Sequence, residues 1–360
     1  MPALIPNQFV INSHPYTESL IRWYSAAKRD LPWRQTRDPY IVWVSEIILQ
    51  QTRVEQGLPY FHRFIAAFPT LHHLANARED RVLSVWQGLG YYSRARNMQA
   101  AAKQVVTDFG GIFPKNYADI LRLKGVGPYT AAAIASICFD EPRPVVDGNV
   151  FRAASRLFGI RADIMKVGSR NAFVQALELV IDPKQPGTFN QAMMELGSAI
   201  CQPTPKCIEC PVQAFCFAFE KQETANLPVK GKKLKVKERH IHYLVLSDGA
   251  RVLMHKRETK DIWRGLYDFP TIESAEVESL WREKSVHISN TYIHLLSHQK
   301  LHVTFYRVVV NGADLKEFAR TYRAKSYSIK QILTLPKPIL VANYIADVFV
   351  SDRHVEDLIK

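Results

Sequence analysis

The sequence predicts two domains of different fold class, a mainly α-helical region over residues 1–220 and an α+β region over residues 240–360. Three observations predict this division. Apolar residues recur at spacings of three and four from Tyr16 to about Phe219, which is the period of a helix. The period changes to two from about His240, which is the period of a strand. At 360 residues the chain is also long for a single domain.

The first region divides into short helices. Apolar spacing predicts helices over five stretches, at residues 17–28, 40–56, 95–108, 129–138 and 150–158. Proline and glycine between these stretches, as at Gly110-Gly111 and Phe113-Pro114, end one helix and allow the next to begin.

The second region follows a basic linker at residues 221–239. The linker carries the cations Lys230, Lys232, Lys233, Lys235, Lys237 and Arg239, a run that is typical of a solvated connector. Beyond it, Asp248-Gly249 lies between two apolar runs, which predicts a β-hairpin. Polar residues alternate with apolar ones around His302, which predicts a further strand.

The overall composition limits the class of protein. A net charge of +13 indicates a polyanionic partner, with nucleic acid one candidate among several. The sequence has no apolar run long enough to span a bilayer and no basic-then-apolar leader. We therefore expect a cytoplasmic protein with no targeting segment and no membrane partner.

Four of the five cysteines lie close together, at Cys201, Cys207, Cys210 and Cys216. A chain without an export signal keeps its thiols reduced, which favours a metal site over disulfides. Four thiolates suit either a tetrahedral zinc ion or a [4Fe–4S] cluster. Only Cys207 and Cys210 have the spacing of a zinc knuckle, and Pro211 follows directly, so the pattern favours one [4Fe–4S] cluster over zinc.

The segment Lys124-Gly125-Val126-Gly127-Pro128 is predicted to bind a phosphate. Two glycines around one apolar residue allow a tight turn with exposed N–H groups. Pro128 begins a helix at a position where its missing N–H costs nothing. Free N–H groups at the positive end of a helix attract an anion, and Lys124 adds a charge. These features are typical of a helix–hairpin–helix clamp on the DNA backbone.

Two carboxylates are candidates for catalysis. Asp147 precedes a predicted helix, whose positive end favours its ionised form, although it can also be an ordinary N-cap. Glu46 is the only carboxylate in an apolar run, so burial would raise its pKa and make it a proton donor; alternatively it lies on a solvated helix face. Hydrolysis of an N-glycosidic bond requires a proton on the departing base and stabilisation of an oxocarbenium-like sugar, which such a pair can supply.

These motifs resemble those of a known family. The cysteine loop, Leu123-Lys-Gly-Val-Gly-Pro-Tyr-Thr130 and Val146-Asp-Gly-Asn-Val150 resemble the helix–hairpin–helix base-excision glycosylases. Three more motifs narrow the resemblance to the MutY-type adenine DNA glycosylases: Leu31-Pro-Trp-Arg34, Glu46-Ile-Ile-Leu-Gln-Gln-Thr52 and Gly88-Leu-Gly-Tyr-Tyr92. The matches cover about residues 16–219 in the expected order.

The resemblance implies a fold and a set of roles. The first domain would be a six-helix barrel with an iron–sulfur subdomain that holds one [4Fe–4S] cluster. Asp147 would be the catalytic aspartate and Glu46 the acid that protonates adenine N7, while Tyr129 and Asn149 organise the site. The adenine pocket would consist of Trp33, Arg34, Leu49 and Gln191. The contacts with the lesion and the DNA would come from Gln51, Thr52, Leu89, Tyr91, Lys124, Gly125, Val126 and Gly127, with Tyr91 wedged into the base stack.

The second domain resembles the Nudix-like module with which this family reads 8-oxoguanine. Leu296-Ser297-His298 matches the Phe-Ser-His loop of the family, with Leu in place of Phe. The Glu-rich helix that holds Mg²⁺ in Nudix hydrolases is missing after Gly265, so we expect recognition rather than hydrolysis. The cluster loop also differs, because five residues separate Cys201 from Cys207 where the family has six.

The expected function is excision of adenine opposite 8-oxoguanine or G in double-stranded DNA, by a monomeric enzyme that is nucleoid-associated if the source is bacterial. Strand-cleaving relatives carry a Schiff-base lysine where this chain has Tyr129, so we expect a monofunctional glycosylase. Two alternatives are an oxidised-pyrimidine glycosylase/lyase of the same fold and a non-catalytic iron–sulfur DNA-binding protein.

Overall fold

The computed structural model describes residues 13–166, 168–231, 236–259, 261–273, 286–296 and 299–350. The chain forms two compact units. The first comprises Met1–Phe61, Phe68–Ala75 and Ala100–Lys232, and the second comprises His62–Ala67, Asn76–Gln99 and Lys233–Lys360. The second unit therefore contains the C-terminal region together with two segments from the helical part of the sequence.

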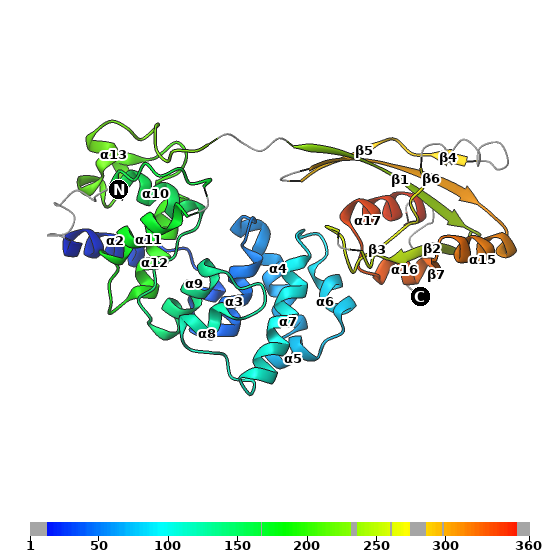
Figure 1. Ribbon diagram of the computed structural model, residues 1–360, viewed down its shortest axis with the longest axis horizontal. Helices are drawn as coiled ribbons and strands as arrows, with labels where there is room; N and C mark the ends of the chain where they lie inside the picture. Colours follow the sequence, from blue (N-terminus) through cyan, green and yellow to red (C-terminus); the bar gives the residue numbers. More distant parts are fainter. Residues whose placement is uncertain are drawn as a thin grey trace. The chain divides into compact units, whose positions relative to one another are not determined.

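The first unit is helical (Figure 1). Its helices are α2 (Ser13–Ala27), α3 (Pro39–Ile48), α8 (Tyr117–Leu121), α9 (Pro128–Phe139), α10 (Gly148–Phe158), α11 (Arg170–Glu178), α12 (Pro186–Glu195) and α13 (Phe217–Glu220). Three more helices contribute residues to both units: α4 (Val54–Ala67), α5 (Leu71–Asn76) and α7 (Ser93–Asp108). Between them lie the 3₁₀ turn η1 (Pro32–Arg34) and the π-helical segment η2 (Leu196–Ile200).

Two helices form the centre of this unit because they are apolar on nearly every side. All but two residues of α3 are buried, and α9 is buried from Thr130 to Ser136. A helix without a polar face has to pack on all sides, and α9 contacts α3, α8 and α12. The N-terminus of α3 is fixed by Asp38, which accepts a hydrogen bond from the backbone N–H of Tyr40 at 2.8 Å.

The prediction of one helix over residues 40–56 is wrong, because the chain turns between Ile48 and Val54. Gln51 has a φ of 61°, a left-handed conformation that interrupts the helix. The turn brings Leu49 against Gly57, where an added Cβ would lie 2.9 Å from the Leu49 side chain. The predicted stretches at 95–108, 129–138 and 150–158 fall within α7, α9 and α10, and the stretch at 17–28 extends one residue beyond α2.

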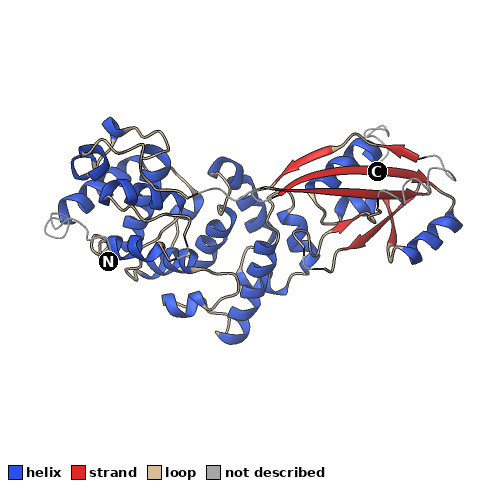
Figure 2. Cartoon of the chain, turned by 45° about the horizontal axis from the view of Figure 1, so that its top comes forward, coloured by secondary structure: helices blue, strands red, loops and turns tan. Residues whose placement is uncertain are grey.

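The second unit contains a mixed sheet (Figure 2). Its strands are β1 (Lys237–Ser247), β2 (Arg251–Lys256), β3 (Tyr267–Asp268), β4 (Val286–Ile288), β5 (Tyr292–Leu295), β6 (Gln299–Val309) and β7 (Lys325–Ser328). The main order is β3-β2-β1-β6-β4, with β5 also paired to β6 and β7 to β2. The predicted hairpin at Asp248-Gly249 is confirmed, because Ser247 pairs with Val252 in antiparallel register. In contrast, β1 pairs with β6 in parallel register, with His240 opposite His302.

Helices cover both faces of this sheet. On one face, Tyr344 of α17 (Ile339–Ile345) stacks on Phe305 of β6 with ring centres 4.0 Å apart. On the other face, Leu315 of α15 (Gly312–Thr321) packs with Leu246 and Val308. The unit also contains α6 (Glu79–Trp86) and α16 (Ile329–Thr334).

Candidate active site

Glu46 lies in the buried helix α3 and is only 7% exposed. Burial raises the pKa of its carboxyl to about 7, because a charged carboxylate is poorly solvated there. The alternative interpretation of Glu46 as part of a solvated helix face is therefore wrong. At neutral pH this carboxyl is present in both protonation states, which is what a proton donor requires.

Tyr129 lies in the first turn of α9 and contacts Glu46. Its phenol donates a hydrogen bond to Glu46 Oε2 at 2.5 Å. This bond favours the ionised carboxylate and partly offsets the effect of burial on the pKa of Glu46. Burial also raises the pKa of Tyr129, and the negative charges of Glu46 and Asp147 raise it further. The phenol therefore remains protonated and acts as a donor.

Asp147 is the N-cap of α10, as one interpretation of the sequence proposed. It accepts hydrogen bonds from the backbone N–H of Val150 at 2.7 Å and from the amide of Asn149 at 3.0 Å. Burial raises the pKa of Asp147, whereas these bonds and the charge of Arg152 act in the opposite direction. The negative charge of Asp147 also raises the pKa of Glu46 and of Tyr129. The helix cap and the second carboxylate of the site are thus the same residue.

Arg152 connects this carboxylate to the cysteine loop, a connection that the sequence analysis missed. Its Nη2 donates to the amide oxygen of Asn149 at 3.0 Å and to the carbonyl of Gly197 at 2.7 Å. Its Nε donates to the carbonyl of Cys201 at 2.7 Å. Gly197 lies so close to Asn149 that an added Cβ would come within 2.7 Å of the Asn149 side chain. One guanidinium group therefore holds Asn149 against the start of the loop.

Two of the four candidates for the adenine pocket are positioned by polar contacts. Nη2 of Arg34 forms a salt bridge of 2.5 Å with Glu195, and Gln191 accepts a hydrogen bond of 2.8 Å from the phenol of Tyr24. The Arg34 guanidinium also lies over the Tyr24 ring, 5.4 Å from its centre. Glu195 holds a second cation, Arg29, at 2.7 Å.

The other two candidates make apolar contacts. The buried ring of Trp33 packs edge-on against Phe61 at 5.0 Å. Leu49 is half-buried in the turn after α3. The sequence analysis missed Tyr24, Arg29 and Glu195. For Glu195 a signal existed, because it is the only carboxylate among the apolar residues around it, as Glu46 is in its own run.

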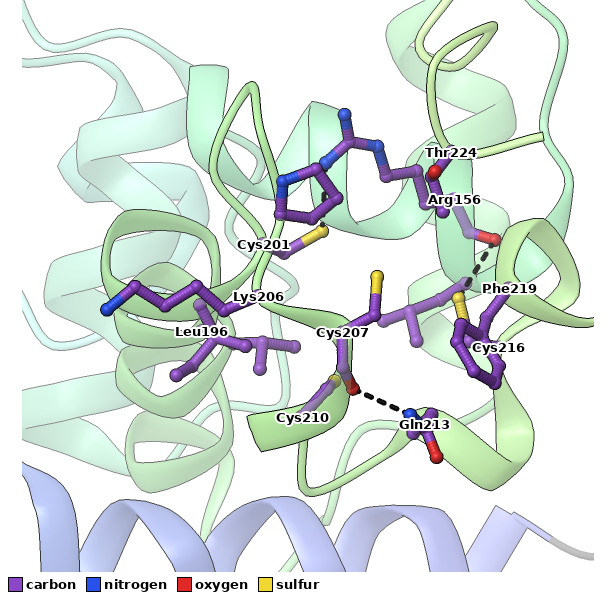
Figure 3. Close-up of a pocket in the computed structure, with 13 residues that line it drawn as sticks. Arg156, Leu196, Cys201, Lys206, Cys207, Cys210, Gln213, Cys216, Phe219 and Thr224 are labelled. Carbon is purple, nitrogen blue, oxygen red and sulfur yellow. Dashed lines mark hydrogen bonds between the residues drawn. The ribbon is translucent and has the colours of Figure 1, made fainter. Parts of the chain in front are cut away.

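The four clustered cysteines surround one cavity. Figure 3 shows Cys201, Cys207, Cys210 and Cys216 around this space, together with Arg156 and Gln213, which also line it. No three of these sulfur atoms, all of which are among the described residues, lie within 4.8 Å of one another. A single tetrahedral zinc ion would bring its thiolates to about 3.8 Å from each other. The wider spacing suits a larger group.

Arg156 holds the first part of the cysteine loop in place through hydrogen bonds. Its buried guanidinium donates to the carbonyls of Gln202 at 2.6 Å, Pro203 at 2.9 Å and Leu227 at 3.0 Å. It also approaches the sulfur of Cys201 at 3.5 Å. A cation among four cysteines stabilises thiolates, which are the form that binds a metal.

The predicted phosphate-binding hairpin lies between α8 and α9. Gly125 has a φ of 76°, which a residue with a side chain rarely adopts. The N–H groups of Lys124 and Val126 are used inside the protein, by Gln104 Oε1 and the Leu123 carbonyl. Within the part of the chain that the structure describes, the N–H groups of Gly125 and Gly127 have no acceptor. In this hairpin the backbone N–H groups of Gly125 and Gly127 are therefore the ones that can donate to a phosphate.

The lesion-contact candidates lie in both units. In the first unit, Gln51 and Thr52 occupy the turn between α3 and α4. In the second unit, Leu89 is buried, whereas Tyr91 is 46% exposed and has a φ of 47°. A tyrosine in the left-handed region is strained, and such strain is common at functional sites.

A cavity of about 280 Å³ in the second unit brings distant segments of the chain together. Leu89 and Tyr91 line it with Trp263, His294 and Leu296. The next two residues along the chain, Ser297 and His298, lie outside the described residues. Leu296, the first residue of the predicted lesion-reading loop, therefore lines this cavity.

Comparisons with known proteins match both units. Residues 44–178 match the HhH-GPD superfamily of base excision DNA repair proteins, and residues 242–347 match the NUDIX domain. The adenine DNA glycosylase of Buchnera aphidicola from Schizaphis graminum is 32% identical in an alignment 336 positions long, which covers 90% of this chain and 96% of that protein. The human adenine DNA glycosylase is 32% identical in an alignment 364 positions long, which covers 82% of this chain and 67% of that protein.

The chain belongs to the adenine DNA glycosylase family. It is therefore a DNA N-glycosylase of base excision repair that acts on adenine, and the predictions of its family, its reaction class and both folds are confirmed. A thermostable thymine-DNA glycosylase shares the first fold, with a TM-score of 0.52 and 27% identity over 58% of this chain and 97% of that chain. A trapped endonuclease III–DNA intermediate, at 20% identity and a TM-score of 0.51 over 61% of this chain and 99% of that one, shows the fold alone. Among the described residues, no helix of this glycosylase has both the length and the apolar character needed to cross a membrane.

Proposed function

We propose that this glycosylase excises adenine from double-stranded DNA where the opposite base is 8-oxoguanine or G. Glu46 donates a proton to N7 of the extruded adenine, which makes the base a better leaving group. The bond between C1′ and N9 then breaks, and Asp147 stabilises the positive charge that develops on the sugar. A water molecule supplies the hydroxyl group at C1′ and returns a proton to the carboxylates. The products are free adenine and an abasic site.

The hydrogen bond between Tyr129 and buried Glu46, together with the effect of the Asp147 charge on both groups, is the observation that carries this proposal. The negative charge of Asp147 raises the pKa of Glu46, yet the surroundings of the two carboxyls differ. Glu46 has a pKa of about 7, and its hydrogen-bond donor is the phenol of Tyr129. Asp147 accepts bonds from a backbone N–H and a side-chain amide, which stabilise its charge. Two carboxyls in different environments are the arrangement by which one acts as an acid and the other stays ionised.

In the adenine pocket, Trp33 and Leu49 offer apolar surface for the purine ring. Arg34 and Gln191 supply hydrogen bonds, and their partners Glu195 and Tyr24 keep them in place. Preorganised donors and acceptors discriminate strongly between bases, because a wrong base leaves buried polar groups unpaired.

We infer that the enzyme is monofunctional. Cleavage of the strand by related enzymes proceeds through an imine with a lysine, and the corresponding position here is Tyr129. A phenol cannot form an imine. The phenol is also already engaged with Glu46, which indicates a role in setting the protonation of that acid.

The cysteine cavity fits a [4Fe–4S] cluster. Four thiols line one cavity, no three of their sulfurs lie within 4.8 Å of one another, and Arg156 is close enough to balance thiolate charge. Cys201, Cys207, Cys210 and Cys216 would be the ligands, and the bound cluster would join the segments of the loop through iron–thiolate bonds. Through Arg152, that loop would support Asn149 and the position of Asp147.

Recognition of the lesion is the proposed role of the second unit and of the turn after α3. Tyr91, which lines the cavity of the second unit with Leu89 and Leu296, would enter the base stack. Ser297 and His298 would form hydrogen bonds with the opposite purine. Gln51 and Thr52, in the turn after α3, are also proposed to contact the DNA at the lesion. The hairpin glycines Gly125 and Gly127, with Val126 and Lys124 beside them, would hold a backbone phosphate.

The test is excision by an Asp147→Asn variant on duplexes with adenine opposite 8-oxoguanine, G or T. We expect the variant to bind DNA as the wild type does and to lose excision, because asparagine keeps the N-cap but not the charge. Wild-type enzyme should prefer 8-oxoguanine over G and both over T. Unchanged excision by the variant would contradict the role of Asp147. Efficient covalent trapping of damaged DNA with borohydride would instead indicate the glycosylase/lyase alternative.

A further inference from the structure

Three side chains of the types that bind metal ions lie together on the sheet of the second unit. They are distant in sequence from the cysteine loop. Glu238 and His240 lie near the start of β1, and His302 lies near the start of β6. Because the two strands are parallel with His240 opposite His302, all three side chains project from the same face of the sheet. One potential ligand atom from each residue lies within 4.8 Å of the others.

The side chains are arranged so that small rotations would complete a site. The rings of His240 and His302 are stacked, with centres 4.7 Å apart and planes 11° apart. Oε2 of Glu238 lies 3.6 Å from Nε2 of His302. Two donors on one tetrahedral zinc ion are about 3.4 Å apart. Glu238 and His240 are exposed and can rotate, whereas His302 is only 18% exposed and provides a fixed donor.

His302 also has an unsatisfied atom at this point. Its Nε2 is buried and has no hydrogen-bond partner among the described residues. A buried ring nitrogen without a partner is costly, and such an atom calls for a specific explanation, such as an ion. Coordination of a metal would satisfy it.

We propose that Glu238, His240 and His302 bind a Zn²⁺ ion. Two imidazoles and one carboxylate suit zinc rather than Mg²⁺ or Ca²⁺, and three protein ligands leave a position for water or another oxygen ligand. The ion ties the start of β1, where the chain leaves the basic linker, to β6. The His302 ligand lies four residues beyond His298 of the predicted lesion-reading loop.

The positive charge of Lys300 should weaken zinc binding at this site, which provides a test of the proposal. The ammonium group of Lys300 lies 3.4 Å from Oε1 of Glu238, the oxygen that does not face His302. A cation at this distance competes for the carboxylate and weakens binding of a second cation. Removal of the Lys300 charge is therefore expected to strengthen zinc binding, the opposite of what removal of a ligand does.

The experiment is equilibrium dialysis of the full-length, iron-containing protein against zinc chloride, with zinc and iron counted in the same sample. We expect one zinc ion per chain in the wild type, more than tenfold weaker binding in His240→Gln and in His302→Gln, and tighter binding in Lys300→Gln. His242→Gln is the matched control, because His242 lies on the same face outside the ligand set, and it should bind zinc as the wild type does. Iron content should stay constant throughout.

Thermal unfolding provides a second measurement that does not depend on counting metal. Zinc should raise the Tm of the wild type and of His242→Gln but not that of His302→Gln, because an ion that binds only the folded state stabilises it. Equal zinc binding by the wild type, His240→Gln and His302→Gln would overturn the proposal. Zinc uptake accompanied by loss of iron would also overturn it, because the cysteines would then be the site.

Discussion

Tyr129 and Glu46 are 83 residues apart in the sequence, and a hydrogen bond of 2.5 Å joins the phenol of one to the carboxylate of the other. The bond favours the ionised form of Glu46, whereas burial in α3 favours the neutral form. The pKa of about 7 is the balance of these two effects and of two smaller ones, because the charge of Asp147 raises it and that of Arg34 lowers it, and burial is the largest of the four. A change on either side of this balance should therefore alter the pH dependence of excision.

The rate of excision should fall as the pH rises above about 7, because the reaction needs protonated Glu46. In Tyr129→Phe the bond that stabilises the carboxylate is lost, so the pKa of Glu46 rises and this alkaline limb moves to higher pH. The measurement is the single-turnover rate of adenine release as a function of pH. Tyr117→Phe, in the neighbouring helix α8, is the control. An alkaline limb at the same pH in both variants would exclude the proposed coupling.

Glu46→Gln should stabilise the protein at alkaline pH while it slows excision by a factor of about 10² to 10⁴. The folded-state pKa is raised from 4.5 to about 7, so the folded state holds the proton more tightly and stability falls as the pH rises through this window. Removal of the charge should raise the free energy of unfolding at pH 8 by up to about 3 kcal/mol and have little effect at pH 4. Denaturant unfolding at both pH values checks this.

Glu195→Gln is the matched comparison for that experiment, and it should lower the free energy of unfolding rather than raise it. Burial alone would raise the pKa of Glu195, but hydrogen bonds from Arg29 and Arg34 lower it below its usual value. Its carboxylate therefore stabilises the folded state at neutral pH, and this contribution is lost as the pH falls through the folded pKa. We expect the substitution to destabilise the protein by about 3 kcal/mol, because it leaves two cations with a weaker partner. Stabilisation by both glutamine variants would contradict the assignment.

Arg152→Gln should slow excision by about tenfold to a hundredfold while the cysteine loop keeps its iron. The substitution removes the guanidinium that joins the Asn149 amide to the Cys201 carbonyl. Asp147 then loses an oriented partner and a nearby positive charge. The measurement is the single-turnover rate together with iron content. Arg161→Gln, which removes an exposed ion pair with Glu223, should leave the rate unchanged.

Tyr91→Asn should reduce extrusion of adenine from the duplex. Asparagine tolerates the left-handed conformation of Tyr91 but lacks the ring that would fill the vacated stack. Fluorescence of 2-aminopurine in place of the target adenine reports on extrusion directly. Arg323→Asn is a matched control, because Arg323 has a φ of 48° in the same unit and is exposed. Equal signals from the two variants would remove the role of Tyr91 as a wedge.

A Ser297→Ala/His298→Ala variant should lose preference for 8-oxoguanine over G more than it loses rate. These residues are proposed to contact the base opposite the adenine and not the reacting bond. The ratio of excision rates on the two duplexes measures the preference. His287→Ala, an exposed histidine of the same unit, serves as the control. An unchanged ratio would mean that discrimination lies elsewhere, for example in Gln51 and Thr52.

Patterns of neighbouring residues were sufficient to predict much of the secondary structure of this protein. The spacing of apolar residues predicts most of the helices, Asp248-Gly249 predicts the hairpin, and Pro128 after two glycines predicts the start of α9. Each of these features depends on neighbours within a few residues. The break between α3 and α4 was missed because Gln51 carries no local signal for a left-handed conformation. In the same turn Leu49 lies against Gly57, a contact that the spacing of apolar residues does not predict.

By itself, the sequence determined the family, the two fold classes and the candidate residues, because these are written in motifs of adjacent residues. Only the tertiary structure decided which of them meet. Glu46 and Tyr129 come from different helices, Arg152 reaches Cys201 across 49 residues, and His240 faces His302 through a parallel pairing. The raised pKa of Glu46 arises from its burial. The partners of Arg34, Arg152 and Arg156 arise from contacts between distant segments. Neither burial nor long-range contact is specified by the spacing of residues along the chain.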